Sequence, residues 1–144
     1  MTEPMKKIFF YGLFMDHSLL TGKGLHPQLI GPAVLRGYRI QIGERATLLP
    51  SGSSRAYGIL MELADDEARS LYAEPGVRDY APERVTVEIL DTAEVSEADC
   101  YNLPADLALA GANPAYAAKL SELAAALDFD PEYVKEVAAF GRDG

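Results

Sequence analysis

The sequence is poor in the residues that build disulfide frameworks and metal centres. Its 144 residues include one cysteine, Cys100, and two histidines, His17 and His26. A single cysteine cannot form an internal disulfide, and these three residues lack the short spacings of a zinc site. We therefore expect no bound metal. Cys100 is typical of a small buried hydrophobe, and His17 fits a loop surface better than the edge of a pocket.

Basic side chains and long apolar runs are also scarce. Thirteen basic and 22 acidic side chains give a net charge of −9 and a pI near 4.6. A nucleic-acid backbone is repelled by such a surface, and no basic patch offsets it, so a small-molecule partner is favoured over nucleic acid. No apolar run approaches the roughly 18 residues of a membrane span. The N-terminus lacks the layout of a secretory signal, which predicts a cytoplasmic protein without a membrane partner.

The apolar pattern that is present predicts one α+β domain over residues 1–144. Strand-like runs cover residues 6–12, 33–43, 56–63 and 83–90, with a weaker run over 98–103. A bulge is expected at Gly37, and a short strand is expected to end in a turn at residues 50–54. Because few strands are separated by a long helix, the sheet should be mostly antiparallel.

Helical periodicity appears in three places. A short helix should begin with Asp65 as its N-cap and stop before Pro75. Asn113-Pro114 and Asp130-Pro131 each supply an N-cap followed by proline at the first helical position, which predicts two C-terminal helices. Their apolar stripes favour docking on the domain, although a separate interaction module built from these helices is an alternative.

The stretch "FFYGLF", residues 9–14, is a candidate binding loop. A Tyr-Gly pair at a strand end can turn successive backbone N–H groups toward one point, which binds a carboxylate or an oxyanion without a basic side chain. Gly12 would permit a positive φ and a close approach of the ligand. The alternative is structural: Gly12 ends a strand and the apolar residues after it fill the core.

Glu74 is a candidate general acid or base. It follows Leu71 and Tyr72 at the end of the predicted short helix. The negative end of the helix dipole and apolar neighbours would both favour the protonated carboxyl, which suits proton transfer near neutral pH. The alternative is a solvated glutamate that precedes a turn.

Taken in order, these motifs resemble the gamma-glutamylcyclotransferase-like (AIG2-like) family. The matching segments are "YGLF" at 11–14, "LRGYRI" at 35–40, "YGILMEL" at 57–63, Glu74 and Tyr80. The resemblance implies a small, mixed, mostly antiparallel β-barrel, with a short helix after the central strands and the C-terminal helices packed outside. It also implies that Tyr11, Gly12, Leu13, Phe14 and Tyr80 bind substrate and that Glu74 is catalytic.

The resemblance further implies an enzyme, of transferase or lyase type, that cyclises a γ-glutamyl amide to 5-oxoproline and releases an amine or amino acid. Such a reaction needs no metal or organic cofactor. The sequence leaves open whether the enzyme is a monomer or a homodimer. Two positions depart from the family pattern: Leu13 replaces serine or threonine, and Ala81 replaces a common arginine. These departures motivate an alternative, a non-catalytic binder of a small anionic metabolite. Tyr57, Tyr72 and Tyr101 are interpreted as core or rim residues.

Overall fold

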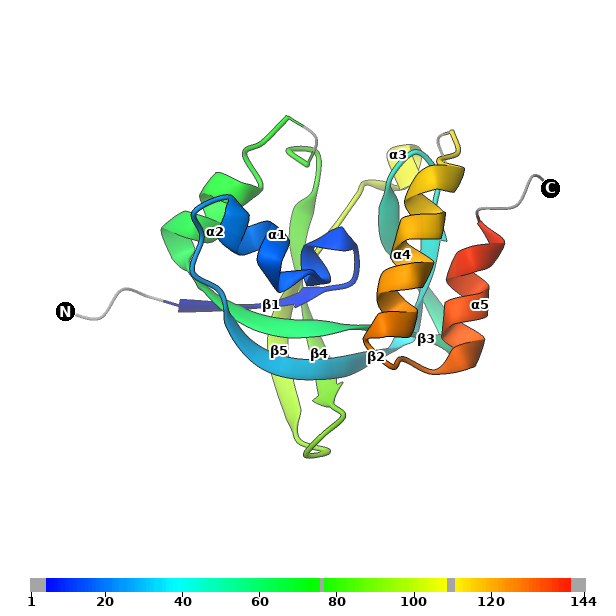
Figure 1. Cartoon of the computed structure of the whole chain (residues 1–144), viewed down its shortest axis with the longest axis horizontal. Helices are drawn as coiled ribbons and strands as arrows, with labels where there is room; N and C mark the ends of the chain where they lie inside the picture. Colours follow the sequence, from blue (N-terminus) through cyan, green and yellow to red (C-terminus); the bar gives the residue numbers. More distant parts are fainter. Residues whose placement is uncertain (1–4, 76, 109–110, 141–144) are drawn as a thin grey trace.

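Five strands and the surrounding helices are described by a computed structural model over residues 5–75, 77–108 and 111–140 (Figure 1). The strands are β1 (Met5–Phe10), β2 (Gln28–Ile42), β3 (Ala46–Ala64), β4 (Ala81–Ile89) and β5 (Val95–Asn102). The helices are the 3₁₀ turn η1 (Leu13–Met15), α1 (His17–Gly22), α2 (Asp65–Leu71), α3 (Ala105–Ala108), α4 (Pro114–Ala126) and α5 (Pro131–Ala139).

The strands close into a small barrel in the order β1-β3-β2-β4-β5. The paired strands run antiparallel except at the closing seam, where Ile8 of β1 lies parallel to Asp99 of β5. Closure places β1 between β3 and β5, which explains why Ile8, Phe9 and Phe10 are almost completely buried. The α+β class and the mostly antiparallel barrel expected from the sequence are confirmed.

The long β2–β3 pair differs from the sequence prediction. The expected turn at residues 50–54 does not separate two strands, because β3 runs from Ala46 to Ala64 and pairs with β2 on both sides. The register changes there: Arg36 opposes Arg55, whereas Tyr38 opposes Pro50. Gly37 lies between these pairs with a φ of +87°, so the predicted bulge is confirmed. Residues 51–54 of β3 have no partner on β2 and bulge out opposite Gly37.

The helices follow the sequence signals in part. The side chains of Asn113 and Asp130 accept the backbone N–H groups of Tyr116 and Glu132, so both predicted N-caps are confirmed. The N-cap of α2 is Ala64 rather than Asp65, because β3 continues in extended conformation to Ala64 and the helix begins directly after it.

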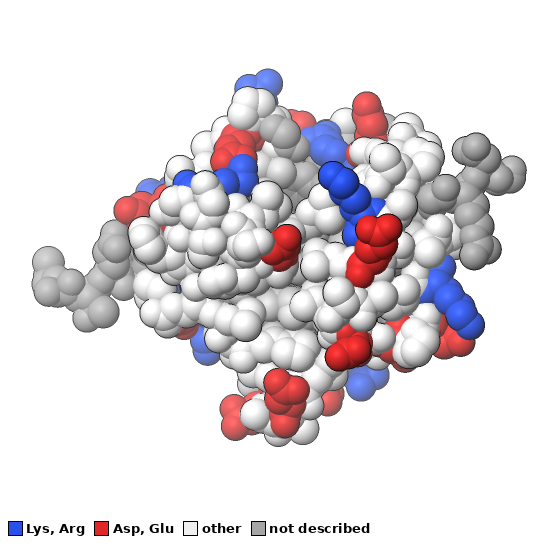
Figure 2. Space-filling view, viewed as in Figure 1, with Lys and Arg blue, Asp and Glu red and all other residues white. Residues whose placement is uncertain are grey.

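Helices α4 and α5 lie side by side on one flank of the barrel, while α1 and α2 lie together toward the other end (Figure 1). Ala117, Leu120 and Ala124 of α4 are buried, so the apolar stripe of α4 is docked on the domain. In the described ranges no helix is long and apolar enough to cross a membrane. The face shown in Figure 2 carries acidic and basic side chains interspersed, with no basic cluster.

Candidate functional site

A hollow of about 250 Å³ lies where β1 leads into η1. This volume is slightly below the range of roughly 300–1,000 Å³ that is usual for drug-sized ligands, so it suits a small molecule. Most of its lining side chains are aromatic. The lining residues are Phe9, Phe10, Tyr11, Gly12, Leu13, Phe14, Leu19, Arg45, Ala46, Tyr72, Val77, Tyr80, Tyr101 and Tyr116. The hollow therefore brings together five of the six residues named from the sequence, namely Tyr11 to Phe14 and Tyr80.

Tyr11 anchors the binding loop to the end of the neighbouring strand β5. Its hydroxyl lies 2.6 Å from the Tyr101 carbonyl and 3.0 Å from Asn102 Oδ1. The buried Asn102 Oδ1 also accepts the backbone N–H of Leu48 at 3.1 Å, so one amide side chain ties β1 and β3 to β5. Burial raises the pKa of Tyr11 well above its ordinary value, so the phenol stays neutral and acts as a donor.

The backbone of the loop differs from the expectation. Gly12 adopts φ −106° and ψ −155°, an extended conformation that does not need glycine, so the expected positive φ is wrong. Leu13 N–H donates to the Tyr116 hydroxyl over a long 3.4 Å. The hydrogen bonds found among the described residues include none from the N–H groups of Gly12 or Phe14. Two cavity-lining residues, on either side of Leu13, thus keep backbone donors that the surrounding strands do not use.

Gly12 is required by a close approach rather than by its dihedral angles. A Cβ at this position would lie 2.6 Å from the Tyr116 hydroxyl oxygen. Gly12→Ala should therefore lower the free energy of unfolding by about 1–3 kcal/mol, as overpacking generally does. Denaturant titration measures this loss. Tyr116→Phe removes the opposing oxygen, so the double variant should regain most of the loss.

Gly22→Ala is the matched control, because nothing lies within 4 Å of a Cβ built there. It should leave stability unchanged or slightly raised. If Gly12→Ala and Tyr116→Phe were simply additive, the close contact would not be the reason for the glycine.

An aromatic stack forms part of the wall of the hollow. The rings of Tyr72 and Tyr101 lie parallel, with centroids 3.7 Å apart and an interplanar angle of 6°. Phe14 meets Tyr72 edge-on at 6.1 Å, which joins the loop to the stack. The Tyr80 hydroxyl donates to the Ala46 carbonyl. Burial raises the pKa of both Tyr72 and Tyr80, so these side chains are neutral over the physiological range.

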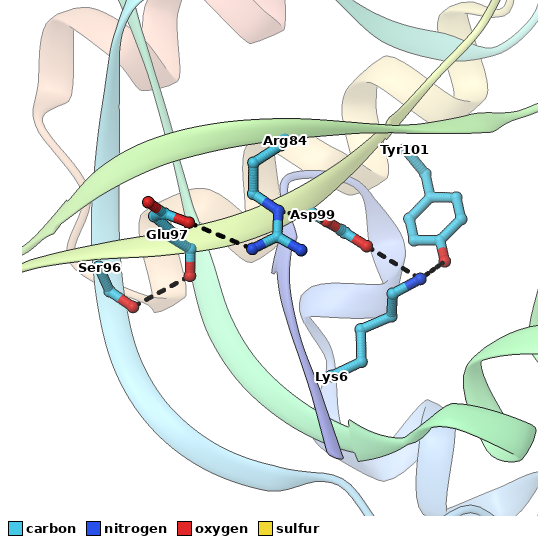
Figure 3. A network of polar contacts seen from close by, with 6 residues as sticks. All are labelled: Lys6, Arg84, Ser96, Glu97, Asp99 and Tyr101. Carbon is cyan, nitrogen blue, oxygen red and sulfur yellow. Dashed lines mark hydrogen bonds and ion pairs between the residues drawn. The ribbon is translucent and has the colours of Figure 1, made fainter. Parts of the chain in front are cut away.

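An ionic network of Lys6, Asp99, Arg84 and Glu97 contacts Tyr101 at its hydroxyl (Figure 3). Lys6 Nζ lies 2.9 Å from Asp99 Oδ2 and donates to the Tyr101 hydroxyl at 3.1 Å. Arg84 Nε contacts the other Asp99 oxygen at 3.0 Å and its guanidinium reaches Glu97 at 3.3 Å. Partial burial opposes the charge on Lys6, but the hydrogen bonds to Asp99 and Tyr101 outweigh it and raise the pKa of the ammonium. The network fixes the position of the Tyr101 ring through its hydroxyl.

Glu74 lies outside the described lining of the hollow. Helix α2 ends at Leu71, so Glu74 falls in the turn beyond it rather than at a helix terminus. Its side chain is 42% exposed and its Oε1 lies 2.8 Å from Lys23 Nζ. The expected desolvation of this carboxylate is therefore wrong, because the early end of the helix leaves it beside a partly solvated lysine. Tyr72 and Val77, which flank Glu74 in the chain, do line the hollow.

Sequence reasoning missed Arg45 and Tyr116 as site residues. Tyr116 lies in the helix predicted from Asn113-Pro114, and its hydroxyl reaches the loop only because α4 packs beside η1. Tyr72 and Tyr101 lie on the cavity wall, in keeping with their interpretation as rim residues.

Cys100 is buried as expected, and burial raises the pKa of its thiol. His17 is exposed as expected, with Nε2 3.2 Å from the Pro27 carbonyl, but it begins helix α1 instead of lying in a loop.

The family model described as gamma-glutamyl cyclotransferase, AIG2-like, matches residues 8–122. The chain belongs to this family. No curated protein sequence matches it.

Three solved structures show the same fold. A protein named gamma-glutamyl cyclotransferase is 15% identical, with a TM-score of 0.76 over 94% of this chain and 88% of that chain. YkqA from Bacillus subtilis is 22% identical, with a TM-score of 0.78 over 96% of this chain, which spans only 55% of YkqA. A yeast gamma-glutamyl cyclotransferase specific to glutathione is 13% identical, with a TM-score of 0.66 over 97% of this chain and 96% of that chain. At these identities the likeness concerns the fold.

Proposed function

We propose that the protein cyclises a γ-glutamyl amide to 5-oxoproline and releases the attached amine or amino acid. The α-amino nitrogen attacks the γ-carbonyl carbon, a ring C–N bond forms, and the original amide C–N bond breaks. One proton leaves the attacking nitrogen and one reaches the departing nitrogen, so the reaction needs no external oxidant or second substrate. Because both reacting groups belong to one molecule, a site that folds the substrate correctly supplies much of the rate through proximity.

The observation that carries this proposal is the loop of residues 11–14. It belongs to a chain of the cyclotransferase family, it lines a hollow of suitable size, and the N–H groups of Gly12 and Phe14 have no acceptor in the part of the chain that the structure describes. Backbone donors of this kind can stabilise the oxyanion of the tetrahedral intermediate or hold a substrate carboxylate. Tyr80 and the Tyr72–Tyr101 stack would enclose the apolar part of the substrate.

Glu74 is proposed as the group that moves the proton. Its carboxylate already pairs with one ammonium, that of Lys23, and in the sequence Glu74 lies between Tyr72 and Val77, which line the hollow. A substrate α-ammonium could exchange with Lys23 and release one proton to solvent, which leaves a neutral amine as the nucleophile. As the ring C–N bond forms, the attacking nitrogen would pass its second proton to Glu74. The protonated carboxyl would then donate that proton to the leaving nitrogen as the original amide C–N bond breaks. We further expect the reaction to take place in the cytoplasm, in a monomer or homodimer, without a metal or organic cofactor.

The test is product formation from a panel of γ-glutamyl amino acids and γ-glutamyl alkylamides. Chromatography should detect 5-oxoproline and the free amine in equal amounts for at least one member of the panel. The reaction should be absent from a preparation inactivated by heat. Failure of the whole panel to react would reject the proposed reaction.

The second candidate is a non-catalytic binder of a small anionic metabolite. It is favoured by one observation: within the described ranges, no residue lining the hollow carries a carboxylate. A thermal-shift measurement with the same panel separates the two functions. Stabilisation with product supports the enzyme, and stabilisation without product supports the binder.

A further inference from the structure

Arg45 brings positive charge into an otherwise uncharged wall. Among the described residues that line the hollow, it alone has a charged side chain. It lies in the turn between β2 and β3, where its carbonyl accepts the Gly43 N–H at 3.1 Å. Its guanidinium lies 5.9 Å from the centre of the Tyr80 ring, on the same wall. A cation over an aromatic face in a small hollow is well placed to receive an anionic group.

A protein carboxylate already occupies the outer side of this guanidinium. Arg45 Nη1 lies 3.1 Å from Asp79 Oδ2, and the side chains are 30% and 48% exposed respectively. Asp79 does not line the hollow, so the pair spans from solvent to the cavity wall. Ion pairs at this exposure contribute little net stability, and therefore exchanging Asp79 for another carboxylate should cost little.

We propose that Arg45 binds the carboxylate of the ligand and that Asp79 competes with it. A guanidinium can hold a carboxylate through two parallel N–H donors, which also fixes the direction of the ligand. The remaining wall is mostly aromatic, so the ligand class is a small carboxylate with an amide or apolar body. The inference rests on the proposed function only for the identity of the bound carboxylate. Under that function, Arg45 binds the α-carboxylate of the γ-glutamyl substrate and of 5-oxoproline.

The assignment also separates two roles that the loop could play. If Arg45 holds the carboxylate, the N–H groups of Gly12 and Phe14 remain for the oxyanion. The site would then contain one anchor for the charge that is present throughout the reaction and another for the charge that develops during it.

The experiment is calorimetric titration with 5-oxoproline and with 2-pyrrolidinone, the same ring without the carboxylate. Arg45→Gln should weaken binding of 5-oxoproline by about tenfold or more, since it removes a charge-assisted hydrogen-bonding partner. Asp79→Asn should strengthen it several-fold, because the competing carboxylate is gone. Neither variant should change binding of 2-pyrrolidinone more than about twofold, and Arg36→Gln, on an exposed arginine, should change neither ligand.

A second ligand pair keeps this inference separate from the proposed reaction. 3-Phenylpropanoate and 3-phenylpropanamide differ in the carboxylate but carry no γ-glutamyl group. If the protein makes no 5-oxoproline yet binds 3-phenylpropanoate more tightly than the amide through Arg45, the reaction is wrong and the anchor stands. If 5-oxoproline forms but Arg45→Gln binds it as the wild type does, the anchor is wrong and the reaction stands. Absence of any preference for a carboxylate in both pairs overturns the anchor.

Discussion

Replacing Glu74 by glutamine should lower the rate of 5-oxoproline release by about 10²–10⁴-fold, the usual contribution of a positioned general acid or base. Glutamine keeps the size of the side chain but cannot take the proton from the attacking amine. The effect should fall on kcat more than on KM, because the proton moves in the transition state. Steady-state kinetics on the best substrate of the panel measures both.

Two variants calibrate this result. Lys23→Met removes the ammonium that now pairs with Glu74, so the rate should stay equal or rise. Glu67→Gln alters a neighbouring carboxylate of α2 that accepts the His26 N–H at 3.0 Å, and should leave the rate unchanged. If Glu74→Gln were as active as the wild type, another group must move the proton. Glu74 would then serve only as the surface ion-pair partner of Lys23.

Alkaline pH should unfold the protein cooperatively as its buried tyrosines ionise. A phenol has a pKa of about 10 in an unfolded chain. Burial raises the pKa of Tyr116 to about 12, and it raises the pKa of Tyr11, Tyr72 and Tyr133 as well. The stability that these neutral phenols contribute is complete below pH of about 10 and is lost as the pH rises toward their folded values. Each group lowers the free energy of unfolding by up to about 1.4 kcal/mol per pH unit in that window.

Several such groups together exceed the roughly 5–15 kcal/mol of a typical domain within a few pH units. Tyrosinate absorbance and far-ultraviolet circular dichroism should therefore change together above pH of about 10. The chain has eight tyrosines and no tryptophan, so the absorbance change reports tyrosine directly. Tyr116→Phe should make stability fall less steeply with pH. Ionisation of all eight tyrosines near pH of about 10, with unchanged dichroism, would contradict the prediction.

The sequence predicted the strands well where local chemistry decides the outcome. A local pattern predicted each of four elements. They are the apolar run of β1, the alternation of β4, and the Asn-Pro and Asp-Pro starts of α4 and α5. The sequence predicted a turn in the serine-rich stretch of β3, because its composition is typical of a turn. In the structure the residues before and after this stretch both pair with β2, and the stretch stays part of one strand. The short helix α1 was missed since its six residues are too few to show a period.

The site was only half visible in the sequence. The contiguous loop of residues 11–14 could be found from its pattern. Arg45 and Tyr116 could not, because they come from distant segments and meet the loop only when the barrel and α4 are assembled. The catalytic role of Glu74 stays a prediction, and its expected burial is wrong because α2 ends at Leu71, three residues earlier than expected.

The parallel seam between β1 and β5 has a consequence for how the chain acquires its hollow during synthesis. The first strand can find one neighbour in β3, but its second neighbour emerges some ninety residues later, as the 90-residue separation of Tyr11 and Tyr101 illustrates. Tyr116 arrives later still. Until then the apolar first strand would remain half covered, so a ribosome-bound fragment ending before β5 should be prone to aggregate and should bind no ligand.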